Sequence, residues 1–337
     1  MLCNYLYGIV LTNADNRMLR KIYYTLNSGK NMKFAYYLCC YMRLLVPRCF
    51  CRNRLPHLLA QIESRKDRDY IMKRVDYYCQ FDSPVVLPES AERLSESWKK
   101  VWGGNVYMHD TYEFTRFFSG DKRWGFEPGD VTYVPEIPSV VKSRPLCDDN
   151  RNSIVLKLDK VRHFIFVNDS KQFEEKEFKV IFRGKIAGKQ SRKDFMTKFY
   201  GNPLFNVGDV GRKTDSPIEW RTGKMTIEEH LDYQFIMAIE GNDVASNLKW
   251  VMSSNSLAVM PRPTCETWFM EGTLIPNYHY VEVAPDFSDV EERVRYYHDH
   301  PEEAKAIIEH AHEYVAQFMD KKREDLISLA VLKKYFG

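Results

Sequence analysis

The sequence predicts an α/β fold whose C-terminal part is built on a parallel sheet. From about residue 177 onward, short apolar runs of strand length alternate with amphipathic stretches of helix length, which is typical of parallel strands joined by crossover helices. Of the 337 residues, 44% are hydrophobic and 28% are charged, a balance that excludes collagen-like, disordered and membrane-embedded proteins. At roughly 150 residues per domain, the length predicts two domains.

The N-terminal segment is strongly basic. Residues 1–60 contain nine Lys or Arg and a single acidic residue, Asp15, which gives a net charge of +8, whereas the rest of the chain carries −5. Such asymmetry indicates an anionic partner, either a nucleic acid or a lipid surface. No nucleic-acid-binding motif is recognisable, so we expect no nucleic-acid partner.

Part of this segment is also amphipathic. The pattern consists of an apolar helical face and a basic fringe: Phe34, Leu38, Met42 and Leu45, then Lys33, Arg43 and Arg48. It is typical of a helix that lies on an anionic membrane surface, and the alternative is an ordinary domain helix that packs its aromatic residues inward. The run is too short and too interrupted to span a bilayer, and no secretory signal is visible. We therefore expect a cytoplasmic protein that lies near a membrane.

The middle of the chain predicts one helix followed by short strands. The helix covers 56–80 and ends at the turn Asp82-Ser83-Pro84, after which Gly and Pro interrupt the chain frequently. The expected strands in this part are 131–134, 154–158 and 164–167. The polar run 168–177 is a candidate domain boundary.

The C-terminal part predicts an alternation of strands and helices. The expected strands are 180–182, 234–239 and 257–260. Three expected helices begin at capping boxes, Ser191-x-x-Asp194, Thr226-x-x-Glu229 and Ser288-x-x-Glu291. The first of these ends at Gly201, a further helix covers 244–253, and Pro301 begins the last amphipathic one.

Two strand-to-helix loops carry candidate binding residues, because ligands of parallel sheets lie beyond the carboxyl ends of the strands. In the first loop, Gly184 and Gly188 let the backbone approach a ligand, and the helix that follows presents its positive N-terminal end. Its cations, Arg183, Lys185, Lys189 and Arg192, suit a diphosphate. The spacing from Gly184 to Lys189 is one residue too short for a P-loop, and the remaining alternative is a solvated basic loop.

The second loop follows the strand at 234–239. It begins with Glu240-Gly241-Asn242-Asp243 and leads into a helix that carries Lys249. An acidic residue at the end of a strand suits the ribose hydroxyls of a nucleotide. Glu240 equally suits a role as a helix cap.

A set of motifs in fixed order resembles glycosyltransferase family 90. The matching stretches are Phe182-Arg183-Gly184 with Arg192, then residues 240–250, 266–268, 276–281 and 286–289, and upstream 129–138 and 142–145. This family includes protein O-glucosyltransferases, capsule-associated transferases and bacterial lipopolysaccharide-core transferases. The resemblance covers about residues 120–320.

The resemblance implies a GT-B-like architecture, in which two Rossmann-like domains face each other across a cleft. It also implies a UDP-sugar as donor substrate, inversion at the anomeric carbon, no cofactor and no bound metal. On this basis we expect a basic, partly amphipathic helical segment at 1–80 and the rest of an acceptor-side domain at 81–170. A nucleotide-sugar-binding domain at 171–320 and a C-terminal helix at 321–337 would follow.

The same resemblance assigns site residues. An inverting transferase needs a base for the acceptor hydroxyl, and Asp130 is the best match, with Glu136 as its rival. The UDP-sugar is expected to bind Arg183, Gly184, Lys185, Arg192, Glu240, Gly241, Asn242, Asp243, Ser246, Asn247 and Lys249.

The expected reaction is hexose transfer to a hydroxyl of a lipid-linked oligosaccharide core or a related glycan. The alternative is a non-catalytic protein that binds a nucleotide sugar during capsule or glycan assembly.

Overall fold

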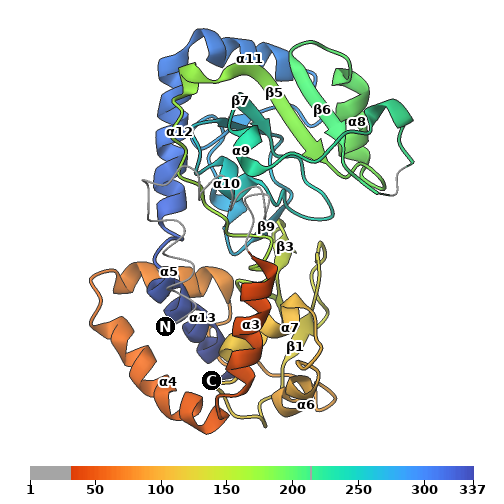
Figure 1. Ribbon diagram of the computed structural model, residues 1–337. Coiled ribbons are helices and arrows are strands. Elements are labelled where there is room, and N and C mark those ends of the chain that lie inside the picture. The colour runs from red at the N-terminus through yellow and green to blue at the C-terminus, as the bar shows by residue number, and fades with distance from the viewer. Residues whose placement is uncertain (1–31, 213–214) are drawn as a thin grey trace. The chain divides into compact units, whose positions relative to one another are not determined.

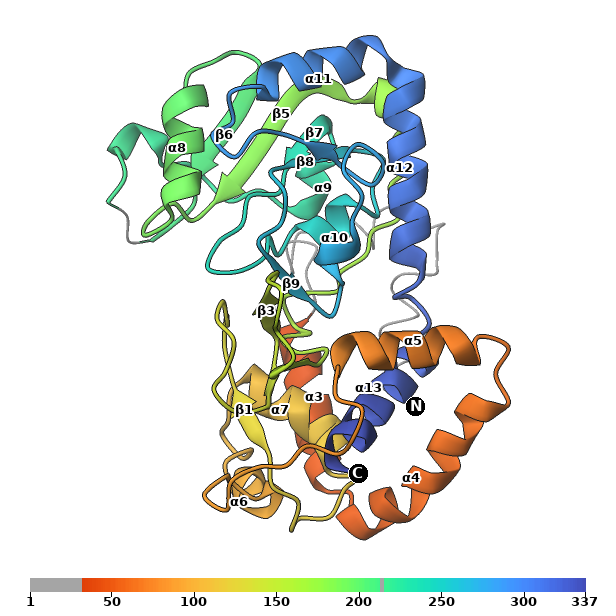
Figure 2. The same cartoon turned by 180° about the vertical axis from the view of Figure 1, so that it is seen from behind.

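The computed structural model describes residues 32–212 and 215–337 (Figures 1 and 2). The first 31 residues, which contain part of the predicted basic segment, lie outside the described residues. The chain forms two compact units, each assembled from separate stretches of sequence. One unit contains Arg162–Pro263 and Thr273–Ala316, and we call it the sheet unit. The other contains Lys33–Val161, Thr264–Gly272 and Gln317–Gly337, and we call it the helical unit.

The sheet unit is built on a five-stranded parallel sheet, as the alternating pattern predicts. Its strands are β5 (Glu177–Gly184), β6 (Phe205–Asp209), β7 (Tyr233–Met237), β8 (Leu257–Met260) and β10 (Val281–Glu282). They are arranged in the order β10-β8-β7-β5-β6, and all neighbours are parallel. In chain order this is the 2-1-3-4-5 arrangement of a doubly wound sheet.

Both faces of this sheet are buried. On one face, Val180, Phe182, Phe235, Met237 and Val259 belong to a hydrophobic cluster that also takes in residues of three helices. These helices are α8 (Gln190–Phe199), α11 (Val290–Asp299) and α12 (Pro301–Ala316). The alternate residues Ile181, Ile236 and Ala258 are buried as well. Two-sided burial is why these strands are continuous apolar runs.

The helical unit combines helices with short strands. Its helices are α3 (Lys33–Leu44), α4 (Arg48–Glu63), α5 (Arg68–Tyr78), α6 (Leu94–Lys99), α7 (Val106–Thr115) and α13 (Lys321–Phe336). A parallel three-stranded sheet contains β1 (Gly125–Glu127), β2 (Ser139–Val141) and β4 (Ser153–Val155) in the order β1-β2-β4. Strand β3 (Ser143–Pro145) pairs antiparallel with β9 (Cys265–Thr267). The predicted α/β class is therefore confirmed.

The helices of the structure agree only in part with those predicted from the sequence. The helix predicted at 56–80 is two helices, α4 and α5, and the chain turns between them where Arg65 pairs with Asp67 at 2.6 Å. The capping box at Thr226 is confirmed, because the Thr226 hydroxyl accepts the Glu229 amide at 3.2 Å at the start of α9 (Ile227–His230). The boxes at Ser191 and Ser288 are wrong, since α8 begins at Gln190 and α11 at Val290.

Two predicted strands are absent for local reasons. At 164–167, Phe164 has a φ of 57°, a left-handed conformation that does not fit a pleated strand. At 131–134, the amide of Val131 donates to the Ser143 hydroxyl at 3.0 Å, and this side-chain bond takes the place of a strand partner. The helix predicted at 244–253 is reduced to one turn, α10 (Leu248–Val251).

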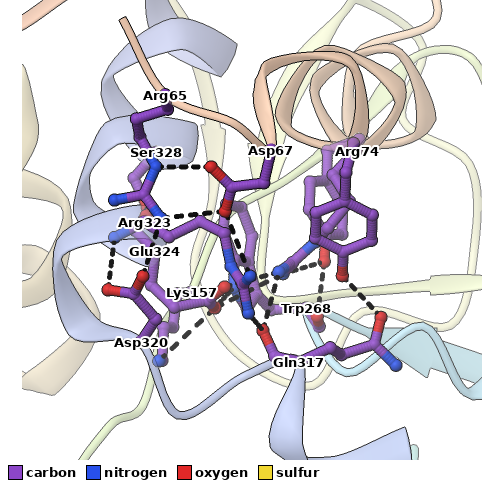
Figure 3. A network of polar contacts seen from close by, with 12 residues as sticks. Arg65, Asp67, Arg74, Lys157, Trp268, Gln317, Asp320, Arg323, Glu324 and Ser328 are labelled. Carbon is purple, nitrogen blue, oxygen red and sulfur yellow. Dashed lines mark hydrogen bonds and ion pairs between the residues drawn. The ribbon is translucent and has the colours of Figure 1, made fainter. Parts of the chain in front are cut away.

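A buried ion pair joins the parts of the helical unit (Figure 3). The guanidinium of Arg74 on α5 contacts the carboxylate of Glu324 on α13 at 2.5 Å, and both side chains are 2% exposed. The indole of Trp268 donates to the same carboxylate at 2.5 Å, and its ring stacks on Tyr78 with 4.0 Å between centroids. The carboxylate therefore holds together three segments that are distant in the sequence.

Replacing Arg74 should destabilise the protein strongly. In Arg74→Met the buried Glu324 carboxylate loses the guanidinium at 2.5 Å and keeps the more distant ammonium of Lys157 at 3.6 Å, which should lower the free energy of unfolding by about 3 kcal/mol. The control is Arg68→Met on the same helix, because Arg68 pairs with Glu63 at the surface and should contribute less than about 1 kcal/mol. Urea denaturation of both variants makes the comparison, and equal losses would contradict the assignment.

Candidate active site

The order of the five-stranded sheet locates the candidate site. Strands β5 and β7 are neighbours, and the connection that leaves β5 for β6 and the connection that leaves β7 for β8 run toward opposite edges of the sheet. The loops after β5 and β7 therefore begin side by side at a topological switch point, where doubly wound sheets bind their ligands. These are the two loops that the sequence selects.

The loop between β5 and α8 is shaped for a close approach to an anion. Ile186 is buried and anchors its middle, whereas Lys185 is exposed. Gly188 has a φ of +68°, which L side chains rarely adopt. The chain then enters α8 at Gln190, and the first amide groups of a ten-residue helix carry a positive partial charge.

Arg192, in the first turn of α8, ties the two loops together. Its Nη1 donates to the carbonyl of Lys185 at 3.1 Å in the loop after β5. Its Nη2 donates to the Ile239 carbonyl at 2.8 Å, and its Nε donates to the Glu240 carbonyl at 3.0 Å, both after β7. Burial lowers the pKa of this guanidinium, and the three carbonyl oxygens hold it in one orientation. We call this arrangement the Arg192 clamp.

Two glycines make room for the clamp. A Cβ atom at Gly241 would lie 3.0 Å from Nη2 of Arg192, and one at Gly184 would lie 3.3 Å from Nη1. At Gly184 it would also meet the Phe182 ring at 2.6 Å. A side chain at either position would therefore crowd the guanidinium.

The loop after β7 is held by a contact with the first loop and by a contact with strand β7. The Asn242 amide oxygen accepts the ammonium of Lys189, which comes from the first loop. The Gly241 amide donates to the Asp243 carbonyl at 3.0 Å, and Asp243 itself is buried. Asn247 donates to the Met237 carbonyl at 2.9 Å, so its amide secures the end of β7.

The other residues of the sheet unit that were predicted to bind the UDP-sugar lie in different surroundings. Ser246 is exposed. Lys249 is fully buried, and its ammonium lies 5.9 Å from the centroid of the Phe164 ring. Arg183 turns toward β6, where it donates to the backbone carbonyl of Asn206 at 2.7 Å and to its side-chain oxygen at 2.6 Å. Burial lowers the pKa of Arg183.

Asp209 is a residue of this edge that our sequence reasoning missed. It ends β6, is buried, and accepts the Gly211 amide at 2.7 Å and the Ser216 hydroxyl at 2.7 Å. It also accepts the Ile186 amide at 3.4 Å, which links it to the first loop. The sequence pattern that selected Glu240, an acidic residue at the end of a strand, could also have selected Asp209.

The two candidate bases, Asp130 and Glu136, belong to the helical unit. The Asp130 carboxylate accepts the ammonium of Lys142, a residue that is 1% exposed, and the Tyr107 hydroxyl at 3.3 Å. Its backbone is set by Gly129, whose φ is +117°. Glu136 is exposed, and its carbonyl accepts the Asn152 side-chain amide at 3.1 Å. Asp130 is thus the more firmly oriented of the two.

Among residues 32–212 and 215–337, no three His, Cys, Asp or Glu side chains are grouped so that they could hold a metal ion.

The chain is similar to known glycosyltransferases. The family described as "Glycosyl transferase family 90" matches residues 155–335, which include the sheet and both loops. The chain is also 40% identical over 271 residues to "O-glucosyltransferase LpsA" of Dichelobacter nodosus. That alignment covers 80% of this chain and 84% of the relative.

Replacing Arg192 by Lys should disrupt the clamp while keeping the charge. An ammonium group cannot reach three carbonyls in fixed directions, so we expect Arg192→Lys to weaken binding of UDP, the ligand predicted from the sequence, by tenfold or more. Isothermal titration calorimetry measures this. Lys193→Gln is the control, because it removes a charge from the next residue without touching the clamp. Wild-type affinity in Arg192→Lys would show that only the charge of Arg192 matters.

Proposed function

Because the chain belongs to glycosyltransferase family 90, we propose that it transfers a hexose from a UDP-sugar to a hydroxyl group of a lipopolysaccharide or lipooligosaccharide core, or of a related glycan. The reaction inverts the anomeric carbon and uses no metal ion or other cofactor. Glucose is the first sugar to test, since the relative from Dichelobacter nodosus is an O-glucosyltransferase. The two units correspond, in this proposal, to the two domains of a GT-B enzyme.

The observation that carries the proposal is the Arg192 clamp at the switch point between β5 and β7. The clamp uses three of the five N–H donors of the guanidinium, so two remain for a ligand. With the N-terminus of α8 and the exposed Lys185, they offer positive charge where a UDP leaving group needs stabilisation. Glu240 and Asn242 would meet the ribose and the diphosphate from the second loop.

Asp130 is the proposed base. An inverting displacement needs a carboxylate that removes the proton of the acceptor hydroxyl as the sugar is attacked. The contacts from Lys142 and Tyr107 orient the Asp130 carboxylate, and side-chain bonds from Ser143 fix the residue that follows it. A base held in this way loses little entropy on reaching its reactive position.

The acceptor is a lipid-linked oligosaccharide, so the proposal also includes a peripheral position on the inner face of the bacterial cytoplasmic membrane. None of the helices that the structure describes is long and apolar enough to cross a membrane.

The reaction is tested by incubating the protein with UDP-glucose, UDP-galactose or UDP-xylose, with and without deacylated core oligosaccharide. We expect UDP release that depends on the acceptor and a product heavier by one sugar, unchanged by a metal chelator. Mass spectrometry reads the product. UDP that raises the unfolding midpoint without any release under these conditions would favour the non-catalytic alternative.

Replacing the proposed base separates chemistry from binding. Asp130→Asn should reduce turnover by about a hundredfold or more, the usual contribution of a general base, and leave the affinity for UDP unchanged. Glu136→Gln is the matched variant and should retain most of its activity. If the large loss of turnover occurs in Glu136→Gln instead, Glu136 is the base.

A further inference from the structure

Helix α3 displays an apolar stripe on the side that faces away from its own unit. Its inner side is anchored to α7: the Tyr36 hydroxyl donates to Asp110 at 2.8 Å, and Arg43 pairs with Glu113 at 2.9 Å. Arg43 therefore does not fringe the apolar face, as the sequence suggested, but holds the helix down. With Tyr36, Cys40 and Arg43 turned inward, residues half a turn away must point outward.

The outward residues are large and apolar. Phe34, Leu38 and Met42 occur at helical spacing on α3, and further exposed apolar residues follow the end of that helix at Leu45, Val46 and Phe50. Phe34 is 77% exposed and Leu45 is 70% exposed. Trp102, which is 72% exposed, adjoins this stripe because its ring packs against Tyr41 of α3 with 5.3 Å between centroids. We call these seven residues the α3 patch.

Exposed apolar side chains in such a number are unusual for a protein surface that meets only water. Single exposed apolar residues are normal, but a contiguous group marks a docking surface. An indole and large aliphatic side chains together are characteristic of segments that enter the boundary between lipid headgroups and acyl chains.

The charge beside the α3 patch indicates which kind of partner would bind it. From Lys33 to Ile62, across α3 and α4, the chain contains Lys or Arg at five positions and no Asp or Glu. Arg48, Arg52 and Arg54 are exposed at the start of α4, on either side of Phe50 in the sequence. A positive border around an apolar stripe complements a bilayer with anionic headgroups, whereas a second copy of this chain would bring the same positive border against it.

We propose that the α3 patch and the arginines of α4 form a docking surface for an anionic lipid bilayer. The apolar side chains enter the interface, and Arg48, Arg52 and Arg54 contact lipid phosphates. This deepens the proposed function, because it assigns the surface through which the enzyme reaches a lipid-linked acceptor. It rests on that function only for its biological purpose.

The test uses the full chain and vesicles of phosphatidylcholine, with or without phosphatidylglycerol. The wild-type protein should sediment with phosphatidylglycerol vesicles and less with phosphatidylcholine alone. The triple variant Phe34→Ser, Leu38→Ser, Leu45→Ser should bind the anionic vesicles at least tenfold more weakly. Arg52→Gln with Arg54→Gln should lose about fivefold for each charge removed, and high salt should reproduce that loss in the wild type.

Two matched controls define the outcome. Val86→Ser and Ile218→Ser remove apolar side chains that are 91% and 74% exposed outside the patch, and they should leave vesicle binding unchanged. UDP affinity should be the same in every variant, so a failure of the docking surface is distinguishable from a failure of the proposed reaction.

Three results would overturn the proposal. One is vesicle binding that the triple variant leaves intact. Another is a wild-type dimer that the triple variant converts to a monomer in light scattering, which would assign the patch to a second copy. The third is a fall of several degrees in the unfolding midpoint of the lipid-free triple variant, which would mean that the patch is covered within the chain.

Discussion

The position of β5 between β6 and β7 is the constraint on which the candidate site depends. The chain leaves β5 toward one edge of the sheet and must pass back across β5 before it forms β7. Two loops separated by about fifty residues of sequence consequently start next to each other. Once they are adjacent, one guanidinium, that of Arg192, can bond carbonyls of both. Gly184 and Gly241 are small because that guanidinium occupies the space beside them.

The segments of the helical unit are held together in a different way, by charged side chains that are buried in pairs. Arg74 and Glu324 join α5 to α13, and Arg144 joins Glu266 at 2.7 Å across the pairing of β3 with β9. Each such charge would be costly to bury without its partner. The segments that carry them are far apart in the sequence, so these pairs help to specify how a discontinuous unit closes. The same unit orients Asp130 through a third buried cation, Lys142.

The proposed reaction and the proposed docking surface meet in one requirement. In this proposal a water-soluble donor and a lipid-linked acceptor reach the same enzyme, so one part of the molecule must suit phosphate and another must suit a bilayer. Near the switch point, Lys189 is held by an amide oxygen and Arg192 by carbonyl oxygens. The arginines of α4 are exposed beside a large apolar stripe. Cations therefore occur in two different environments. Those near the switch point suit a diphosphate, and the exposed arginines of α4 suit the phosphates of a bilayer.

The α/β class, the strands β5, β7 and β8 and the choice of the two loops were predictable from the sequence, because strand burial and glycine-rich loops leave local patterns. The sequence also selected the apolar face of α3, since helical spacing is readable without a structure. Its errors were local, and among them were the capping boxes at Ser191 and Ser288 and two strands, one of them at 164–167, where the positive φ of Phe164 prevents a strand. The contacts of each cation, in contrast, became known only from the three-dimensional arrangement. Arg183, Arg192 and Arg43 are alike as letters, but Arg183 bonds Asn206, Arg192 bonds three carbonyls and Arg43 pairs with Glu113. A side chain's partner depends on which strands and helices become neighbours, and that is a property of the whole fold.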